Sequence, residues 1–236
     1  MLSRKSLARV LVVPVLAAAG LAVAAPAQAS VTGTTSAADF VLQNKCRQHP
    51  VDYALAVTPE TTLWQVKLTL VHPGGTSSEG VDLSSVDGDP TSGTVHFLIC
   101  GSADPGTYTI RTTGSYQVVA PLVNIPVAVA ESTFEVRRAA TRTKLNSTHL
   151  GDDRYRLVAK VKDERRSGFK PTSSAEVVFQ RRVDGAWKVI RGSRAMTDRG
   201  VATAVVNGSA GTRVRAVTRP DGYLDGSTSG PVRLGS

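Results

Sequence analysis

Short stretches in which hydrophobic and polar residues alternate recur along this chain, and this period of two predicts β-strands that bury one face. The clearest alternation is in residues 63–71, where one face of the strand consists of Trp64, Val66, Leu68 and Leu70. We expect this face to lie in a hydrophobic core. Comparable stretches predict further strands over residues 51–57, 94–100, 107–112, 116–119 and 132–137. Residues 76–93 are polar and rich in turn-forming residues, which predicts a long loop or a short edge strand.

The second half of the chain continues the same pattern. In residues 154–162 an apolar face alternates with a mostly basic one. Two predicted strands, residues 176–183 and 186–191, flank Asp184-Gly185, which is a strong signal for a two-residue hairpin turn. Later strands are predicted over residues 201–206, 212–218 and 231–234. Helical periodicity is hard to find after the N-terminal segment, so the predicted fold class is all-β.

An amphipathic sheet must bury its apolar face, and a second sheet is the usual cover. Several short strands per roughly 100 residues, separated by turns, therefore predict two tandem antiparallel β-sandwich domains. The balance of charge changes sign at residues 137–143. We therefore assign the domains to residues 30–137 and 138–236, after an N-terminal segment of residues 1–29.

The formal net charge of +9 is distributed unevenly between the two halves. Residues 30–136 carry four basic and ten acidic side chains, a formal charge of −6, whereas residues 137–236 carry 21 basic and nine acidic side chains, a formal charge of +12. Such asymmetry bears on binding partners rather than on the fold. One consequence to be tested is charge-driven self-association, in which the acidic half attracts the basic half of the same or another molecule.

The N-terminal segment has the organisation of a secretory signal peptide. Basic residues precede an uncharged apolar stretch over residues 10–25, and Ala27-Gln28-Ala29 supplies the small residues that signal peptidase reads. Ser30, rather than Cys, follows the expected cleavage site, which argues against lipid attachment there. No later apolar run is long enough for a transmembrane helix. We therefore expect a secreted, extracellular protein.

The chain has two cysteines, Cys46 and Cys100. An even count in an exported protein favours one disulfide bond, which would stabilise the fold by about 4 kcal/mol in the chain-entropy model. The alternative is a pair of buried or reactive thiols. His49 is the one histidine near either cysteine, and a single neighbour does not make the signature of a thiol enzyme.

The sequence Asp104-Pro105-Gly106-Thr107-Tyr108 resembles the tyrosine corner of immunoglobulin-like (Ig-like) sandwiches. The resemblance implies that the tyrosine hydroxyl bonds to backbone a few residues upstream. The pattern departs from the family after the corner, since Ile110 stands where the second cysteine of antibody domains would be. We expect the disulfide instead to tie an early strand to the strand that precedes the corner, and Trp64 is not given the role of the family's core tryptophan.

The second half resembles the small Ig-like or fibronectin-type-III-like modules of exported bacterial surface proteins. The residues that carry this resemblance are 178–182, 184–189, 197–201 and 213–217, with Trp187 on the strand after the hairpin turn. The resemblance implies a fold, but such modules have many different functions.

No catalytic or metal-binding motif stands out. The four histidines, His49, His72, His96 and His149, lack metal-ligand spacing. Asp82, Asp87 and Asp89 share one loop whose start is similar to that of a calcium loop, but the glycine and glutamate of an EF-hand are missing. Weak calcium binding there, or an unrecognised hydrolase site using these carboxylates, stays as a distant alternative. We predict no cofactor, no metal and no enzymatic activity.

Basic residues of the second half form the one group with an implied partner. They are Arg154, Arg156, Lys160 and Lys162 on one predicted strand, and Arg181, Arg182, Lys188 and Arg191 on or near the hairpin. A solvated strand face that discourages edge-to-edge aggregation accounts for many such charges. A net charge of +12 exceeds that need, so two interpretations stay open: a solubility device, or a face that binds an anionic cell-wall or surface polymer. Aromatic residues are sparse among these charges, so specific binding of nucleic acid is not expected.

The sequence thus favours a secreted, non-enzymatic binding or structural protein at or near the bacterial cell surface. Its alternative, more specific form is an electrostatic binder of anionic polymers that acts through the basic second domain.

Overall fold

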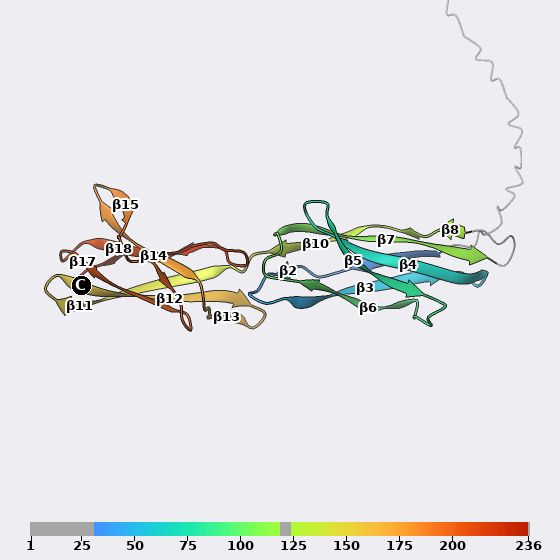
Figure 1. Ribbon diagram of the computed structural model, residues 1–236, viewed down its shortest axis with the longest axis horizontal. Coiled ribbons are helices and arrows are strands. Elements are labelled where there is room, and N and C mark those ends of the chain that lie inside the picture. The colour runs from blue at the N-terminus through green and yellow to red at the C-terminus, as the bar shows by residue number, and fades with distance from the viewer. Residues whose placement is uncertain (1–30, 119–123, 236) are drawn as a thin grey trace, which may run out of the picture.

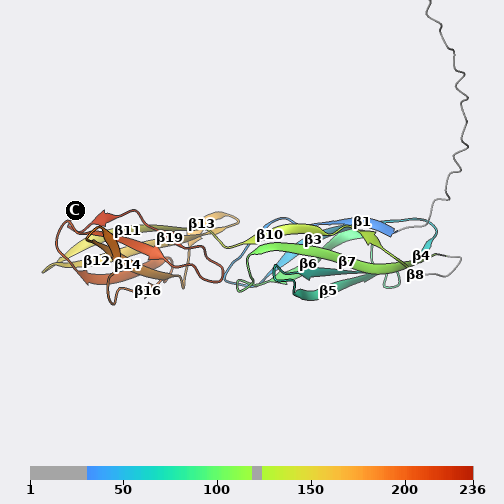
Figure 2. The same cartoon turned by 90° about the horizontal axis from the view of Figure 1, so that it is seen from above.

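The computed structural model describes residues 31–118 and 124–235, and these residues form β-strands and no helix (Figure 1). The prediction of an all-β fold is therefore confirmed for the described part of the chain. The expected signal peptide, residues 1–29, lies outside it. Figures 1 and 2 show the strands gathered into two groups that follow each other along the long axis of the molecule.

Two sheets form the first group. Sheet A has the strand order β6-β3-β1-β9, and sheet B has the order β2-β10-β7-β4-β5, with β8 paired to β7. The strands of sheet A are β1 (Val31–Ser36), β3 (Arg47–Val57), β6 (Ser92–Ile99) and β9 (Ala128–Val129). The strands of sheet B are β2 (Phe40–Val41), β4 (Thr61–Val71), β5 (Ser77–Ser84), β7 (Gly106–Val118), β8 (Asn124–Pro126) and β10 (Ser132–Arg137).

Two further sheets form the second group. In sheet C, β12 lies between β11 on one side and β13 and β17 on the other. Its strands are β11 (Thr141–Gly151), β12 (Arg154–Arg165), β13 (Gly168–Pro171) and β17 (Val201–Asn207). Sheet D has the order β15-β14-β18-β19, with β16 beside β14 and β20 beside β18. Its strands are β14 (Glu176–Val183), β15 (Ala186–Val189), β16 (Ala195–Met196), β18 (Arg213–Thr218), β19 (Ser227–Thr228) and β20 (Val232–Arg233).

Each pair of sheets encloses its own hydrophobic cluster. The first cluster takes its buried side chains from residues 31–136, and the second takes them from residues 139–234. The four residues predicted to form the apolar face of β4 belong to the first cluster and are 0–6% exposed: Trp64, Val66, Leu68 and Leu70. That prediction is confirmed.

The disulfide prediction is confirmed as well. Cys46 and Cys100 are bonded, and they flank the paired strands β3 and β6 of sheet A, in which Arg47 is the partner of Ile99. The bond therefore ties an early strand to the strand that precedes the Asp104–Tyr108 corner. In that corner Tyr108 is fully buried and its hydroxyl donates a hydrogen bond to the backbone oxygen of Asp104 (3.0 Å).

The prediction of purely antiparallel sheets is wrong for two strand pairs. β1 pairs with β9 in parallel, and β2 pairs with β10 in parallel. The cause is that the chain passes from sheet A to sheet B twice, first from β1 to β2 and later from β9 to β10. The two segments run in the same direction, so β1 pairs with β9 and β2 pairs with β10 in parallel. The other pairings between strands are antiparallel in the described residues.

Two predicted strand boundaries also change. The stretches predicted over residues 107–112 and 116–118 are one strand, β7, because their pairing with β4 is continuous from Thr109 to Gln117, while residue 119 lies outside the described part. The polar stretch after residue 76 contains an edge strand of eight residues, β5, so of the two predicted alternatives the short edge strand is confirmed for residues 77–84. It forms because Leu83 is buried in the first cluster while the strand pairs with β4.

The connection between the two groups is short and well bonded. Ala139 N donates a hydrogen bond to Tyr223 O (2.7 Å), and the Tyr223 side chain packs against both hydrophobic clusters. Arg137, the last residue of β10, makes two hydrogen bonds to the carboxylate of Glu164 in β12 (2.7 and 2.9 Å). The first and second groups are therefore joined by side-chain contacts.

Candidate functional site

β12 presents a row of cations on the outer face of sheet C. Its odd-numbered residues from Tyr155 to Val161 are buried in the second cluster, so alternation turns the even-numbered ones outward. The outward side chains include the four cations predicted for this strand, and all four are exposed: Arg154, Arg156, Lys160 and Lys162. The structure thus brings this predicted group together on one face.

β11 adds two cations that the sequence analysis did not include. Arg142 lies opposite Lys162, and Lys144 lies opposite Lys160, in the antiparallel register of β11 and β12. Both β11 residues are exposed, and they point to the same side as their partners. We call the six residues together the sheet C face: Arg142, Lys144, Arg154, Arg156, Lys160 and Lys162.

Few carboxylates lie near the sheet C face. Among the described residues, none of its six side chains forms an ion pair. Asp152 and Asp153 occupy the turn between β11 and β12, each with a positive φ (49° and 55°). The neighbouring strand β17 contributes exposed but uncharged residues, Val201, Thr203, Val205 and Asn207.

The acid at the other end of β12 is already paired. The hydrogen bonds from Arg137 hold the pKa of Glu164 below its usual value, and the same contact raises the pKa of Arg137. Glu164 therefore stays ionised, and it forms its ion pair with Arg137 rather than with a lysine of the sheet C face. Within the face, the guanidinium of Arg142 lies 3.8 Å from the ring centre of Phe169 in β13, which orients the arginine without neutralising it.

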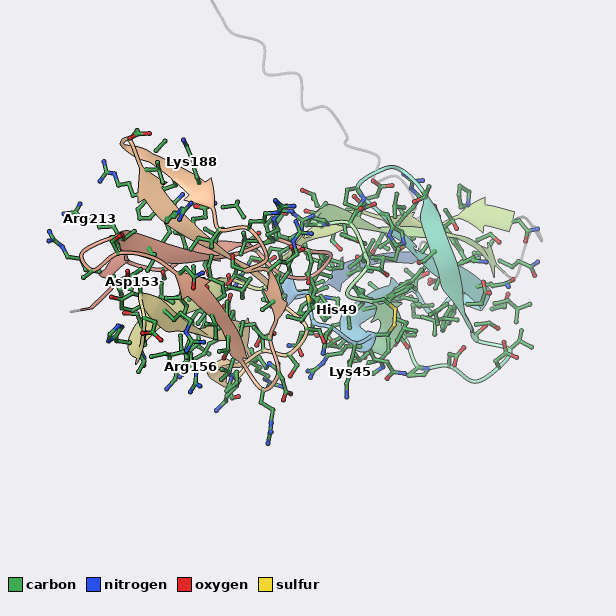
Figure 3. All side chains as sticks on the ribbon, turned by 60° about the vertical axis from the view of Figure 1, so that its left-hand side comes forward. Lys45, His49, Asp153, Arg156, Lys188 and Arg213 are labelled. Atoms are coloured by element: carbon green, nitrogen blue, oxygen red, sulfur yellow. A yellow bond between two sulfur atoms is a disulfide. The ribbon has the colours of Figure 1, made fainter. Side chains whose placement is uncertain are left out.

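The second predicted group of cations lies on the other sheet. β14 and β15 form the predicted hairpin, with positive φ at both turn residues, Asp184 (51°) and Gly185 (80°). Figure 1 shows this hairpin projecting from the rest of the second group. The four predicted residues here are exposed: Arg181, Arg182, Lys188 and Arg191. In Figure 3, Lys188 and Arg156 lie on opposite sides of the second group. The eight predicted cations therefore form two separate groups.

A tryptophan lies among the cations of sheet D. Arg182 is the cross-strand partner of Trp187, and the guanidinium of Arg215 in β18 lies 4.4 Å from the ring centre of Trp187. Arg215 Nε donates a hydrogen bond to Gln180 Oε1 (2.8 Å), which fixes the arginine over the ring. Sequence analysis missed Arg215 and the neighbouring Arg213, because only the pairing of β18 with β14 brings them to the hairpin.

The aspartates of residues 82–89 are engaged in different contacts. Asp82 lies 3.9 Å from Lys67 Nζ, and Asp89 accepts a hydrogen bond from the backbone nitrogen of Ser84 (2.9 Å). In residues 31–118 and 124–235 there is no group of three or more histidine, cysteine or acidic side chains arranged to hold a metal ion. The second contact shows the carboxylate of Asp89 supporting the turn after β5.

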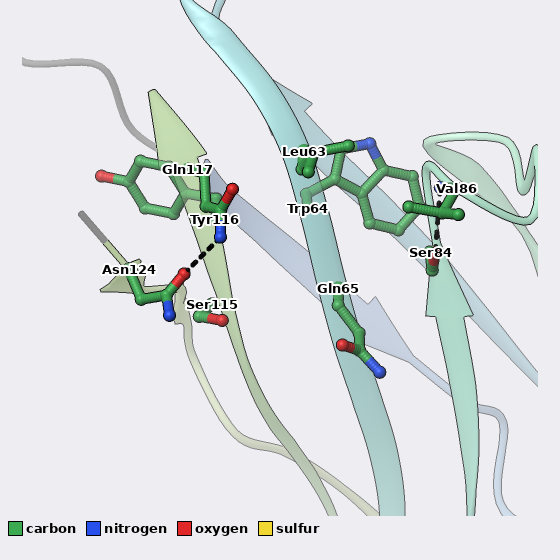
Figure 4. A pocket seen from close by; sticks show the side chains of 9 residues that line it. All are labelled: Leu63, Trp64, Gln65, Ser84, Val86, Ser115, Tyr116, Gln117 and Asn124. Atoms are coloured by element: carbon green, nitrogen blue, oxygen red, sulfur yellow. Dashed lines mark hydrogen bonds between the residues drawn. The ribbon is translucent and has the colours of Figure 1, made fainter. Parts of the chain in front are cut away.

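A shallow depression of about 250 Å³ lies at the end of the first group that points away from the second group (Figures 1 and 4). Its lining comprises Leu63, Trp64, Gln65, Ser84, Val86, Ser115, Tyr116, Gln117 and Asn124. Gln117 Nε2 donates a hydrogen bond to Asn124 Oδ1 across it (2.8 Å). The lining contains no carboxylate, histidine or basic side chain, and Tyr116 is its one residue of a type used in general acid–base catalysis.

Comparison with known proteins finds no family model and no curated protein that matches this chain. Among the described residues, no helix is long and apolar enough to span a membrane. The candidate site therefore stands on its geometry and charge alone.

Proposed function

We propose that this protein is a secreted, non-enzymatic binding protein that attaches to an anionic polymer at the bacterial surface through the sheet C face. The proposal includes two Ig-like sandwiches as the architecture, with the basic second one as the binding module. The disulfide, the hydrogen bond of Tyr108 and the two separately enclosed clusters support that architecture. The lack of a spanning helix in the described residues is compatible with export.

The observation that carries the proposal is the set of six exposed cations on one sheet face that have no carboxylate partner among the described residues. Protection of a sheet edge does not explain the four cations of β12, because β12 is an interior strand that pairs with β11, β13 and β17. Cations placed side by side repel each other in the absence of a ligand. A polyanion turns this repulsion into attraction and releases its own counterions on binding.

The shape of the face favours an elongated ligand. From Arg154 to Lys162 the outward side chains of β12 form a row about 26 Å long, at ~3.3 Å per residue of strand. On the neighbouring strand β11, Arg142 and Lys144 form a second row of cations beside part of this length. A linear polymer with repeated phosphate or carboxylate groups can contact such rows along their length, whereas a single small anion can use only one or two of the charges.

The test uses fluorescently labelled inorganic polyphosphate and the purified mature chain. We expect binding that weakens by about 10²–10³-fold between roughly 50 and 200 mM salt, as expected for about six phosphate contacts. The double change Lys144→Glu with Lys160→Glu should weaken binding by more than about tenfold at the lower salt concentration. A matched control, Lys45→Glu with Arg47→Glu, makes the same change in net charge at exposed positions of the first half.

Absence of binding, or binding that does not change with salt, would reject the proposal. Equal weakening by the two double variants would also reject it, since net charge rather than the sheet C face would then set the affinity. Binding to vesicles of anionic lipid but to neither polyphosphate nor poly-glutamate would replace the polymer by a membrane surface as the partner.

A further inference from the structure

The second group carries a second cationic surface that points away from the sheet C face. Sheets C and D lie on either side of one hydrophobic cluster, to which Leu157 contributes from sheet C and Phe179 from sheet D. The outer faces of two packed sheets point in opposite directions. Arg182 and Arg215, which lie on the outer side of sheet D, are therefore separated from the cations of β12 by the core of the sandwich.

We call this second surface the hairpin surface, and it consists of Arg182, Trp187, Arg213 and Arg215. Along β14 the side chains alternate, so Arg182 and its cross-strand partner Trp187 lie on the outer side with Arg215, whereas Arg181 and its partner Lys188 lie on the side of the buried Val214. Asp184 is the one acidic residue among the paired residues 180–189 of the hairpin and its turn. Among the described residues, Arg182, Arg213 and Arg215 have no ion-pair partner.

Arg215 is held ready for an anion. Its position over Trp187 and its hydrogen bond through Nε to Gln180 restrict the side chain before any ligand arrives. Its two terminal nitrogens make no hydrogen bond with another described residue. A guanidinium fixed in this way loses less entropy when its fork binds a phosphate or carboxylate.

We propose that the hairpin surface binds a second chain of the same polyanion, so that one protein molecule bridges two polymer chains. This inference rests on the proposed function of the sheet C face and adds bivalency to it. The protein would then cross-link anionic polymers rather than only coat them. Once one protein molecule holds two chains together, each further bridge between the same chains is an intramolecular event and forms at a raised effective concentration.

The experiment measures light scattering of polyphosphate chains titrated with the protein. The wild type should raise the scattering at low ratios of protein to polymer and lower it again when excess protein saturates each chain separately. The sheet C variant (Lys144→Glu, Lys160→Glu) and a hairpin variant (Arg182→Glu, Arg213→Glu) should each bind polymer and give little scattering. The Lys45→Glu, Arg47→Glu control has the same net charge as both and should still bridge.

Tryptophan emission supplies an independent readout of the hairpin surface. The chain has two tryptophans, and Trp64 is 6% exposed in the first cluster, so a change on binding reports on Trp187. Polyphosphate should change this emission in the wild type and in the sheet C variant. The change should be lost in Arg215→Gln, which removes the cation above the ring.

Four results would overturn bridging. Wild-type binding without scattering, or undiminished scattering by the hairpin variant, would leave the proposed function intact and reject the second site. Scattering by the protein alone would assign the effect to attraction between its acidic and basic halves. Absence of any binding by the wild type would instead reject the proposed function, and bridging with it.

Discussion

Lys144 and Lys160 lie directly opposite each other in β11 and β12, on the solvent side of sheet C. Arg142 and Lys162 form a second pair of like charges two residues away. Like charges directly opposite each other destabilise a sheet, and no described carboxylate pairs with these four side chains. This arrangement costs stability in the free protein, and a polyanionic ligand would offset that cost.

Lys160→Glu should therefore stabilise the free protein while weakening polymer binding. The new carboxylate would lie opposite Lys144, and we expect the free energy of unfolding to rise by about 0.2–1 kcal/mol. Urea denaturation measures this change, and Lys45→Glu serves as a control that should leave stability within about 0.5 kcal/mol of the wild type. A loss of both stability and binding would show that Lys160 has a structural role instead.

The contact between Arg137 and Glu164 should contribute a modest, pH-dependent stabilisation. Glu164→Gln should lower the free energy of unfolding by roughly 0.5–1 kcal/mol, a value kept low because the Arg137 side chain is 52% exposed. Arg137 lowers the pKa of Glu164 in the folded state, so this stability is complete above the unfolded value near 4.5 and is lost as pH falls through the folded pKa. Denaturation at neutral and acidic pH checks it, since the difference between wild type and variant should shrink in acid.

His49 should make the first half sensitive to mild acid. It is 4% exposed, lies between Phe40 and Phe134 with ring centres 5.1 and 4.6 Å away, and its Nε2 has no hydrogen-bond partner. Burial lowers its pKa, although a hydrogen bond with the backbone of Ala38 opposes this shift. The unfolded chain therefore binds the proton more readily, and stability is complete above about pH 6.5 and falls as pH drops below that value.

A His49→Leu variant provides the comparison for this effect. We expect the urea midpoint of the wild type to fall between about pH 7.5 and pH 5.5 by more than that of the variant. Equal slopes for the two proteins over this range would mean that His49 is protonated in the folded state without cost.

Removing the disulfide should destabilise the protein strongly. The bond closes a loop with a sequence separation of 54 residues, for which the chain-entropy model gives about 4 kcal/mol. The double variant Cys46→Ala, Cys100→Ala avoids free thiols, and its urea denaturation should show the loss without a reductant. Polymer binding by the folded variant should be unchanged, because the sheet C face lies in the second half of the chain and the disulfide lies in the first.

Local patterns predicted the parts of the fold that depend on neighbouring residues. The alternation around Trp64 identified the buried face of β4, and Asp184-Gly185 identified the hairpin, because side-chain period and turn geometry are local properties. β11 escaped prediction because polar residues occupy inward positions that are normally apolar. Thr143 is buried there, where its hydroxyl makes hydrogen bonds to the hydroxyls of Thr218 (2.6 Å) and Ser227 (2.7 Å).

The candidate site was predicted only in part for the same reason. The alternation of β12 placed Arg156 and Lys160 on one face, but the position of Lys144 depends on a strand that the pattern did not reveal. The division of the predicted cations between sheets C and D depends on long-range pairing, which single-strand patterns do not encode. Arg215 reaches Trp187 through the pairing of β14 and β18, whose residues are more than 30 positions apart in sequence.

Lysine footprinting tests the central claim most directly. The protein is treated with a lysine-acylating reagent with and without polyphosphate, and modification of each lysine is measured by mass spectrometry. Binding at the sheet C face predicts protection of Lys144, Lys160 and Lys162, while Lys45 and Lys67 in the first half react as before. Equal protection of all lysines, or protection confined to the first half, would contradict the account.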